Sequence, residues 1–399
     1  AVVTNRWAAF PIFFLMLFAV FQCTFALGDY PMRWIEWCVE ALGDFVSVYM
    51  APGWWKDLVI DGIIGGVGSV LVFLPNILLL YLFITLLEDS GYMARAAFIM
   101  DRMMHKMGLH GKSFIPMIMG FGCNVPAIMA TRAIESRKSR MITMLIIPLM
   151  SCAGRLPVYI LLAGAFFPKK AGLVLVGLYA LGIMLAALSA KVISRFIKDD
   201  DLPFVMELPP YRVPTAKSVF RHTWEKGKQY LQKMAGTILI FSMAIWALGY
   251  FPLNRNIQPG SATQLEQSYI GRIGKFIEPV IEPLGVDWKM GVSIVTGLAA
   301  KEIVVSSMGI LYHVPDAEEN TQTLAENLRK QENNKGEKVF TPLVAYAFML
   351  FILIYFPCMA VIAAIRKEAG GKWAWFSIIY TTTLAWIVSF CVYQIGSLF

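Results

Sequence analysis

The sequence predicts an all-α polytopic membrane protein made of two inverted repeats, each with a re-entrant hairpin of broken helix. Three observations predict this class. Of the 399 residues, 57% are hydrophobic and 16% are charged, whereas a soluble globular domain carries roughly 25% charged residues. Several apolar runs reach the ~20 residues that a membrane-spanning helix needs. A glycine-containing segment also occurs twice with the same internal spacing.

Seven apolar runs are long enough to be membrane-spanning helices. They are 8–27, 63–87, 141–166, 171–194, 231–249, 341–365 and 373–392. The first run could instead be a signal peptide, but its length and the many later runs favour a true first helix. Because the chain opens on Ala1 and reaches an apolar run almost at once, we expect a further domain upstream.

Two further apolar stretches, 113–130 and 289–311, are assigned from the charges around them. The loops 88–112 and 132–140 flank the first stretch, and both carry an excess of Lys and Arg, which favours the cytoplasm. A crossing at 113–130 would put these loops on opposite sides, so we predict a re-entrant hairpin. The loop 191–233, with nine Lys and Arg residues, then also lies inside.

The second stretch is predicted as a mirror image of the first. Segment 313–339 carries six carboxylates against four bases, and the short loop 366–372 after the next apolar run is basic. The acidic segment 313–339 then lies outside and the basic loop 366–372 lies in the cytoplasm if 289–311 enters the membrane from outside and returns to the same side. The result is about seven crossings and two hairpins. A nine-crossing alternative would place the nine bases of 191–233 outside.

The internal repeat rests on matching residues. Gly108, Lys112 and Gly120 have the same spacing as Gly285, Lys289 and Gly297. In this register, Cys123 aligns with Ala300, Asn124 with Lys301, and Val125 with Glu302. Downstream, Pro148 to Cys152 resembles Phe356-Pro357-Cys358. Inverted repeats with broken helices are typical of transporters whose site lies near the bilayer midplane.

This pattern divides the chain into four parts. Residues 1–62 hold the first helix and an outer amphipathic segment (34–49), and 63–195 hold the first repeat with hairpin 113–130. Residues 196–230 form a cytoplasmic loop with an interfacial helix, and 231–399 hold the second repeat with hairpin 289–311.

Three cysteines are the main candidate ligands. Cys123 lies in the glycine-broken string Gly120-Phe121-Gly122-Cys123-Asn124-Val125-Pro126, Cys152 follows Met150 and Ser151, and Cys358 holds the related place in the second repeat. Thiolates are soft ligands for transition metals, and a helix N-terminus favours the thiolate form. A single buried cysteine is more often a small hydrophobe, but the shared context favours function. Asn124, Ser151 and the Met150 thioether are candidates beside them.

Charged residues supply the other candidates. Glu302 lies beside Lys301 in the second hairpin, where a charge costs about 2.5 to 3.5 kcal/mol. The alternatives are a structural pair of these two residues, or a lysine that snorkels outward. Glu88 and Asp89 end the second run and could either accept a cation at the cytoplasmic mouth or cap the following turn. The phosphate-binding string G-x-x-x-x-G-K-[ST] does not occur.

Several long strings resemble the membrane domain of the bacterial ferrous iron transport protein B family. They are residues 86–95, 120–127, 151–159, 206–211 and 297–302. The resemblance implies uptake of Fe²⁺ as substrate across the inner membrane, with Cys123, Cys152 and Cys358 as the family's pore cysteines. It also implies a cytosolic domain that binds GTP and Mg²⁺, absent from this chain, and a small accessory protein. We therefore expect a transporter domain in the lipid bilayer, neither an enzyme nor a nucleic-acid binder.

Two other functions remain open from the residues alone. A nucleoside or organic-anion carrier would depend on Asn124, Lys301 and Glu302, and a thiol redox enzyme would use Cys123 and Cys152. Thiolates also accept Zn²⁺ or Cu⁺, so only the resemblance names iron. Oligomeric state, including a homo-oligomer, and channel-like or alternating access are equally open.

Overall fold

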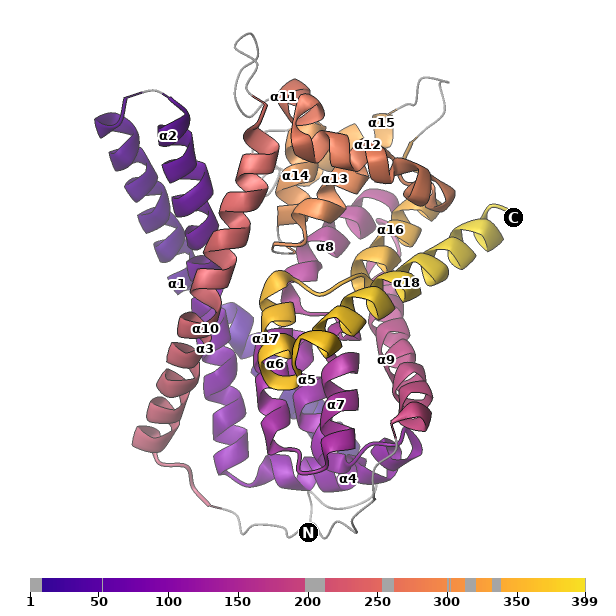
Figure 1. Ribbon diagram of the computed structural model, residues 1–399. Helices are drawn as coiled ribbons and strands as arrows, with labels where there is room; N and C mark the ends of the chain where they lie inside the picture. The colour runs from indigo at the N-terminus through magenta and orange to yellow at the C-terminus, as the bar shows by residue number, and fades with distance from the viewer. Residues whose placement is uncertain are drawn as a thin grey trace. The chain divides into compact units, whose positions relative to one another are not determined.

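The computed structural model describes residues 9–51, 53–197, 212–252, 262–299, 301, 303–312, 321–331 and 339–398, and all regular structure in these residues is helical (Figure 1). The chain divides into two compact units, each described here by itself. The first consists of Ala1–Ile147 and Ala186–Ser242, and the second of Pro148–Leu185 and Met243–Phe399.

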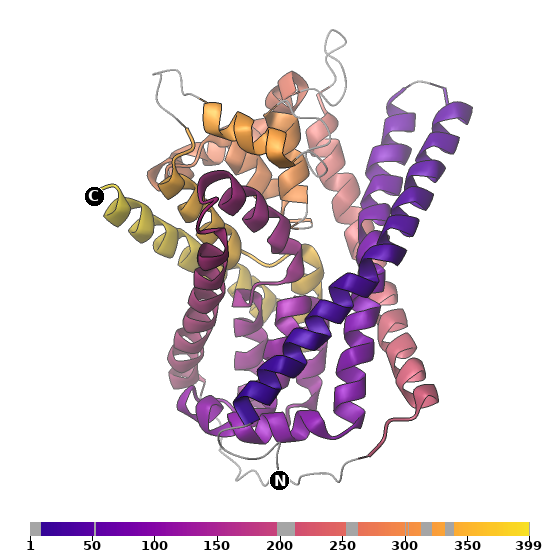
Figure 2. The same cartoon turned by 180° about the vertical axis from the view of Figure 1, so that it is seen from behind.

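The first unit is built around two long helices, α1 and α3, which pack against each other and cross (Figure 2). A π-helical segment, Leu58–Ile64, leads into α3. The helices of this unit are α1 (Ala9–Tyr49), α2 (Trp54–Asp57), α3 (Gly65–Asp89), α4 (Tyr92–Lys106), α5 (Phe114–Gly122), α6 (Asn124–Ala130), α7 (Arg137–Ile146) and parts of α9 (Ala171–Phe196) and α10 (Ala216–Tyr250).

The second unit contains shorter helices that pack in pairs. Helix α16 packs against α18, α12 against α13, and α15 against α8. Besides the remainders of α9 and α10, its helices are α8 (Leu156–Phe166), α11 (Ala262–Gln267), α12 (Tyr269–Ile281), α13 (Trp288–Thr296), α14 (Ile303–Leu311), α15 (Thr321–Lys330), α16 (Pro342–Ile354), α17 (Met359–Ala369) and α18 (Gly371–Gly396).

Among the described residues, 6 helical segments are long and apolar enough to cross a membrane. They are Pro11–Tyr49, Trp54–Asp89, Arg137–Phe166, Ala171–Phe196, Pro342–Ala369 and Gly371–Gly396. Each contains or overlaps a predicted crossing, so the protein is a multi-pass membrane protein. The seventh predicted crossing, 231–249, falls within α10, where the apolar part is the shorter Leu239–Tyr250.

Two predicted pairs of helices are single helices in the structure. The outer segment 34–49 is not separate, because α1 continues through it for 41 residues, or about 60 Å. Gly28 packs so closely on α3 that a Cβ there would lie 1.6 Å from Asn76 Oδ1. Packing therefore overrides the stop that Gly28 and Pro31 suggest. In the same way, the predicted interfacial helix is the first part of α10.

Two of the six spans are interrupted by non-helical backbone, at residues 150–152 between α7 and α8 and at 355–358 between α16 and α17 (Figure 1). These two spans are also the most enclosed. In their most apolar stretches, 67% and 78% of residues are buried, against 22% to 29% in the other four spans. Irregular backbone in a membrane is tolerated where protein covers it, which explains why the breaks lie in these spans.

The predicted first hairpin is a pair of short helices, α5 and α6, separated by one extended residue, Cys123. A helix of 9 residues is about 13 Å long, well short of the ~30 Å hydrocarbon core. The two ends of the segment meet, because Lys112 Nζ lies 2.8 Å from Glu135 Oε1. The residues that flank the two short helices are therefore close together.

The predicted second hairpin has the same arrangement in the second unit. Helices α13 and α14 pack together, and Ser307 Oγ donates to Thr296 Oγ1 over 2.8 Å. At the two ends, the Tyr312 hydroxyl lies 3.4 Å from the Asp287 carboxylate. In each unit, residues just outside the two ends of the segment thus contact each other.

Candidate functional site

The three predicted cysteines share one backbone position. Each immediately precedes a helical segment and has an extended ψ angle, 130° at Cys123, 162° at Cys152 and 157° at Cys358. Each side chain is half-buried. The helices that follow are α6, a 3₁₀ turn leading into α8, and α17. The helix break predicted within Gly120–Pro126 is therefore present at Cys123, whereas the predicted crossings 141–166 and 341–365 are each interrupted, at Cys152 and at Cys358.

Two of these cysteines, Cys152 and Cys358, belong to the second unit. Tyr355 lies within electrostatic range of both Cys152 and Cys358, and also of Arg155. The Tyr355 side chain is 0% exposed, and its hydroxyl has no hydrogen-bond partner among the described residues. Cys123 belongs to the first unit, where Tyr81 lies within electrostatic range of it.

No preformed cluster of metal ligands occurs among the described residues, if a cluster means three or more His, Cys, Asp or Glu side chains. Glu302, the predicted carboxylate ligand, lies outside the described residues. The second unit therefore offers two thiols, the Tyr355 hydroxyl and the carbonyl groups of two unwound segments.

Arg155 holds the carbonyl groups of the first break. Its side chain is 1% exposed, and its guanidinium donates from Nη1 to Met150 O and from Nη2 to Pro148 O, each over 3.0 Å. A planar guanidinium is suited to such a fork. The neighbouring Ser151 Oγ lies 3.4 Å from the Tyr159 hydroxyl. Arg155 thus satisfies backbone oxygens that unwinding leaves without helical partners.

Lys301 has the corresponding role at the second break. Its side chain is 3% exposed, and Nζ donates to Phe356 O over 2.8 Å. Nζ also lies 3.2 Å from the centre of the Tyr355 ring. The Met359 N–H donates to Leu298 O over 3.0 Å. The turn after α13 is therefore joined to the break between α16 and α17 by a backbone and a side-chain contact.

Asn124 makes the matching contact in the first unit. With its amide nitrogen facing the carbonyls, Nδ2 donates to Gly120 O over 2.9 Å and to Ile147 O over 3.3 Å. Ile147 directly precedes Pro148, as Phe356 directly precedes Pro357. The predicted register aligns Asn124 with Lys301. Asn124 and Lys301 thus each donate to a carbonyl that directly precedes a proline, one through an amide and the other through an ammonium group.

The remaining predicted residues are more dispersed. Met150 and Ser151 are each 1% exposed at the first break. Glu88 is exposed and pairs with Lys226 of α10, whose Nζ lies 3.2 Å from Glu88 Oε2, while Asp89 is half-buried at the end of α3. The turn after α3 is capped by Ser90, whose hydroxyl accepts from the Tyr92 N–H. The snorkelling alternative for Lys301 is wrong, because its side chain is buried.

Asp287, at the outer end of the second pair of short helices, is a titratable group that the sequence analysis did not single out. Its carboxylate accepts from the Met290 N–H over 2.9 Å and so caps α13. Burial raises the pKa of Asp287, although the Met290 N–H and the nearby Lys289 oppose the shift.

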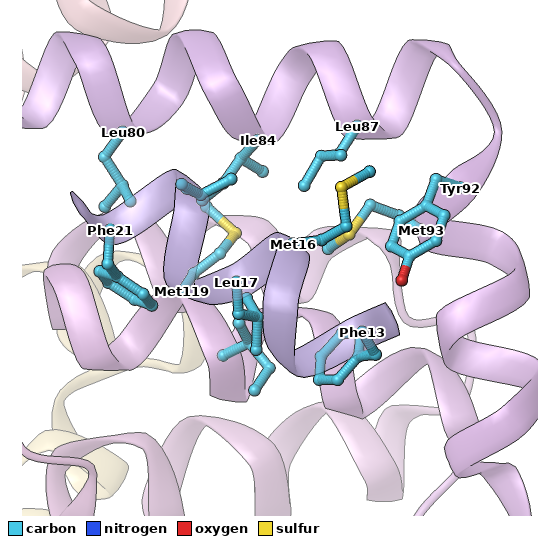
Figure 3. Close-up of a pocket in the computed structure, with 12 residues that line it drawn as sticks. Phe13, Met16, Leu17, Phe21, Leu80, Ile84, Leu87, Tyr92, Met93 and Met119 are labelled. Carbon is cyan, nitrogen blue, oxygen red and sulfur yellow. The ribbon is translucent and has the colours of Figure 1, made fainter. Parts of the chain in front are cut away.

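A small apolar pocket also lies within the first unit, lined by α1, α3, α4 and α5 (Figure 3). Figure 3 shows the thioethers of Met16, Met93 and Met119 among aromatic and aliphatic side chains. None of the predicted ligands lines it.

Sequence reasoning missed Tyr355 and the carbonyl contacts of Asn124 and Lys301. The string Tyr355-Phe356-Pro357-Cys358 could have indicated Tyr355, because two aromatic residues before a proline place their rings beside a carbonyl that the proline leaves unwound. The partners of Asn124 and Lys301 are 23 and 55 residues away in the sequence (147 − 124 and 356 − 301). No local pattern indicates such contacts.

Known proteins match the chain along its whole length. The family model described as "Gate: Nucleoside recognition" matches residues 70–166 and 231–372, and "Ferrous iron transport protein B C terminus" matches 175–226. No solved structure matches this chain.

Three relatives are similar over nearly all of this chain. An Fe(2+) transport protein A/Fe(2+) transporter FeoB fusion protein of Porphyromonas gingivalis is 55% identical over 100% of the chain and 51% of its own length. The Fe(2+) transporters FeoB of Campylobacter jejuni and Staphylococcus aureus are each 44% identical, over 98% and 100% of the chain and 64% and 59% of their own lengths. The chain thus spans between half and two thirds of these relatives, and it belongs to the Gate family, in the branch formed by the membrane part of ferrous iron transport protein B.

Proposed function

We propose that this chain forms the membrane path of a ferrous iron transporter, with Fe²⁺ as its substrate. The observation that carries the proposal is the placement of Cys152 and Cys358 at the backbone breaks of the two most buried spans. Broken helices mark the substrate sites of many transporters, and thiolates suit soft transition metals. The names of the relatives supply the identity of the metal.

The ligands would be thiols with oxygen atoms beside them. Cys152 and Cys358 lie within electrostatic range of Tyr355, whose buried hydroxyl is unpartnered among the described residues. Cys123 and Glu302 would contribute as the transport path changes shape. Glu88 and Asp89 would lie at the inner mouth. Lys226 forms an ion pair with Glu88 there, and an incoming cation would replace Lys226.

In the membrane, the segments 113–130 and 289–311 would form two re-entrant hairpins in inverted repeats. The contacts of Lys112 with Glu135 and of Asp287 with Tyr312 support this topology, since each closes its segment at one end. The aligned contacts of Asn124 and Lys301 support the repeat.

The transporter would work in a bacterial cytoplasmic membrane. The relatives are longer than this chain, and the family resemblance implies that a GTP-binding domain is part of the additional length. Movement of the hairpins would open the path, driven by that domain. The fusion of Fe(2+) transport protein A to the Porphyromonas gingivalis relative supports a small accessory partner.

Uptake of Fe²⁺ into liposomes that contain the full-length protein tests the proposal. Cys152→Ser and Cys358→Ser should abolish uptake, whereas the control Cys391→Ser, at an exposed cysteine of α18, should not. Full uptake by the Cys152→Ser, Cys358→Ser double variant would contradict the ligand assignment. The family description names nucleosides, so the same liposomes should be tested with a nucleoside. Nucleoside uptake that is unchanged by Cys152→Ser and Cys358→Ser would favour the nucleoside-carrier alternative.

A further inference from the structure

Lys301 is a buried cation at an unwound carbonyl. The ammonium group lies 2.8 Å from the Phe356 carbonyl oxygen, 3.2 Å from the centre of the Tyr355 ring and 5.1 Å from the centre of the Phe356 ring. Carbonyl oxygens and aromatic faces both stabilise cations. The groups around Lys301 Nζ therefore form a cation-binding position, and the protein fills it with its own side chain.

The positive charge is not needed to satisfy this carbonyl. In the first unit, the neutral amide of Asn124 donates to Ile147 O, a carbonyl that also directly precedes a proline. A charged group within a membrane is costly and is retained mainly where it pairs or has a function. The comparison of the two units therefore separates the hydrogen bond, which both have, from the charge, which only Lys301 supplies.

The location of the ammonium group suggests what the charge does. Phe356 is two residues from Cys358, and the Tyr355 ring beneath Nζ belongs to the residue that lies within electrostatic range of both Cys152 and Cys358. In transporters with broken helices, unwound carbonyls coordinate the transported cation. A divalent cation at these thiols would repel the ammonium group, because like charges at short range in a low dielectric are strongly unfavourable.

Lysine suits a removable occupant better than arginine does. Arg155 is fixed by two carbonyls at the first break, whereas an ammonium is a point charge on a flexible stem.

We propose that Lys301 is a tethered cation that occupies the carbonyl position at the second break while the path is empty, and that it must leave when a divalent cation binds at Cys358. This inference rests on the proposed function and adds to it a residue that holds the path closed.

Acetylation of lysines in the purified full-length protein, with and without Fe²⁺ under anaerobic conditions and read by mass spectrometry, tests displacement. Fe²⁺ should raise acetylation of Lys301 by about tenfold, within the usual range for coupled sites. Lys289, which also lies over an aromatic ring, 5.0 Å from the centre of Tyr312, is the matched control and should not change. Thiol alkylation in the same samples reports whether Fe²⁺ reaches Cys152 and Cys358.

The two readouts separate this inference from the proposed function. Thiol protection by Fe²⁺ with no change at Lys301 would overturn the tethered cation alone. An absence of both changes would overturn both proposals.

Substitution provides a second test that does not depend on added metal binding tightly. Lys301→Gln keeps a hydrogen-bond donor but removes the charge, as Asn124 does naturally. In liposomes without nucleotide, it should pass Fe²⁺ about tenfold faster than the wild type. Lys301→Arg should restore the closed state, and Lys289→Gln is the control. A folded Lys301→Gln protein that leaks no faster than the wild type would overturn the inference.

Discussion

Replacement of Arg155 by methionine should strongly destabilise the second unit, because it removes both donors to the first break. The Pro148 and Met150 carbonyls each accept a 3.0 Å hydrogen bond from a guanidinium that is 1% exposed. Each buried acceptor left without a partner costs about 1 to 3 kcal/mol. Removal of the buried charge offsets part of this loss, so we expect a net decrease of about 3 kcal/mol in the free energy of unfolding.

The size of the effect should depend on how many carbonyls the replacement can still reach. Arg155→Lys retains one donor group and should lose about half as much. Arg329→Met is the control, because the exposed Arg329 donates to the Ala165 carbonyl at the end of α8, where water can replace it, and it should cost under about 1 kcal/mol.

Thermal unfolding of the detergent-purified protein, at one fixed scan rate because unfolding of such proteins is often irreversible, measures the difference. Arg155→Met should lower the midpoint by roughly 6 to 12 °C. A midpoint no lower than that of Arg329→Met would refute the reasoning, since it would mean that the break does not depend on the guanidinium.

Three further predictions concern packing and charge. Gly297→Ala would bring a Cβ within 2.5 Å of Tyr355 Oη and should lower both the thermal midpoint and Fe²⁺ uptake, whereas Gly164→Ala, with open space around it, should be neutral or stabilising. Burial raises the pKa of Asp287, so the folded protein retains a proton that the unfolded chain releases. The stability of the protein should therefore fall as pH rises from the ordinary Asp pKa of about 3.9 through the raised value. The thermal midpoint of Asp287→Asn should not show this decrease with pH. Glu88→Gln removes an exposed ion pair and should cost under about 1 kcal/mol, a difference that 1 M salt should erase.

The position of one helix break could be predicted from the sequence. Glycine and proline interrupt helices for local steric reasons, so Gly120 to Pro126 indicate a break without any knowledge of the fold. The breaks within 141–166 and 341–365 were not predicted, because long apolar runs there favour continuous helices. Loop charges likewise predicted that the ends of 113–130 lie on one side, and the contact between Lys112 and Glu135 joins those ends.

The length of the helices and the partners of buried polar groups could not be predicted in this way. Helix α1 continues past Gly28 and Pro31 because it packs on α3, which is a tertiary effect. The carbonyl contacts of Asn124 and Lys301 depend on residues that meet only after the chain has folded. Sequence reasoning therefore indicated one of the helix breaks but not which groups satisfy the exposed backbone.

The central claim is that Cys152 and Cys358 bind Fe²⁺ at the two breaks, and site-by-site alkylation tests it most directly. The full-length protein is treated anaerobically with a thiol reagent in the presence and absence of Fe²⁺, and each cysteine is read by mass spectrometry. We predict that Fe²⁺ protects Cys152 and Cys358 and leaves the exposed Cys23, Cys38 and Cys391 unchanged. Equal labelling of Cys152 and Cys358 in both samples would contradict the account.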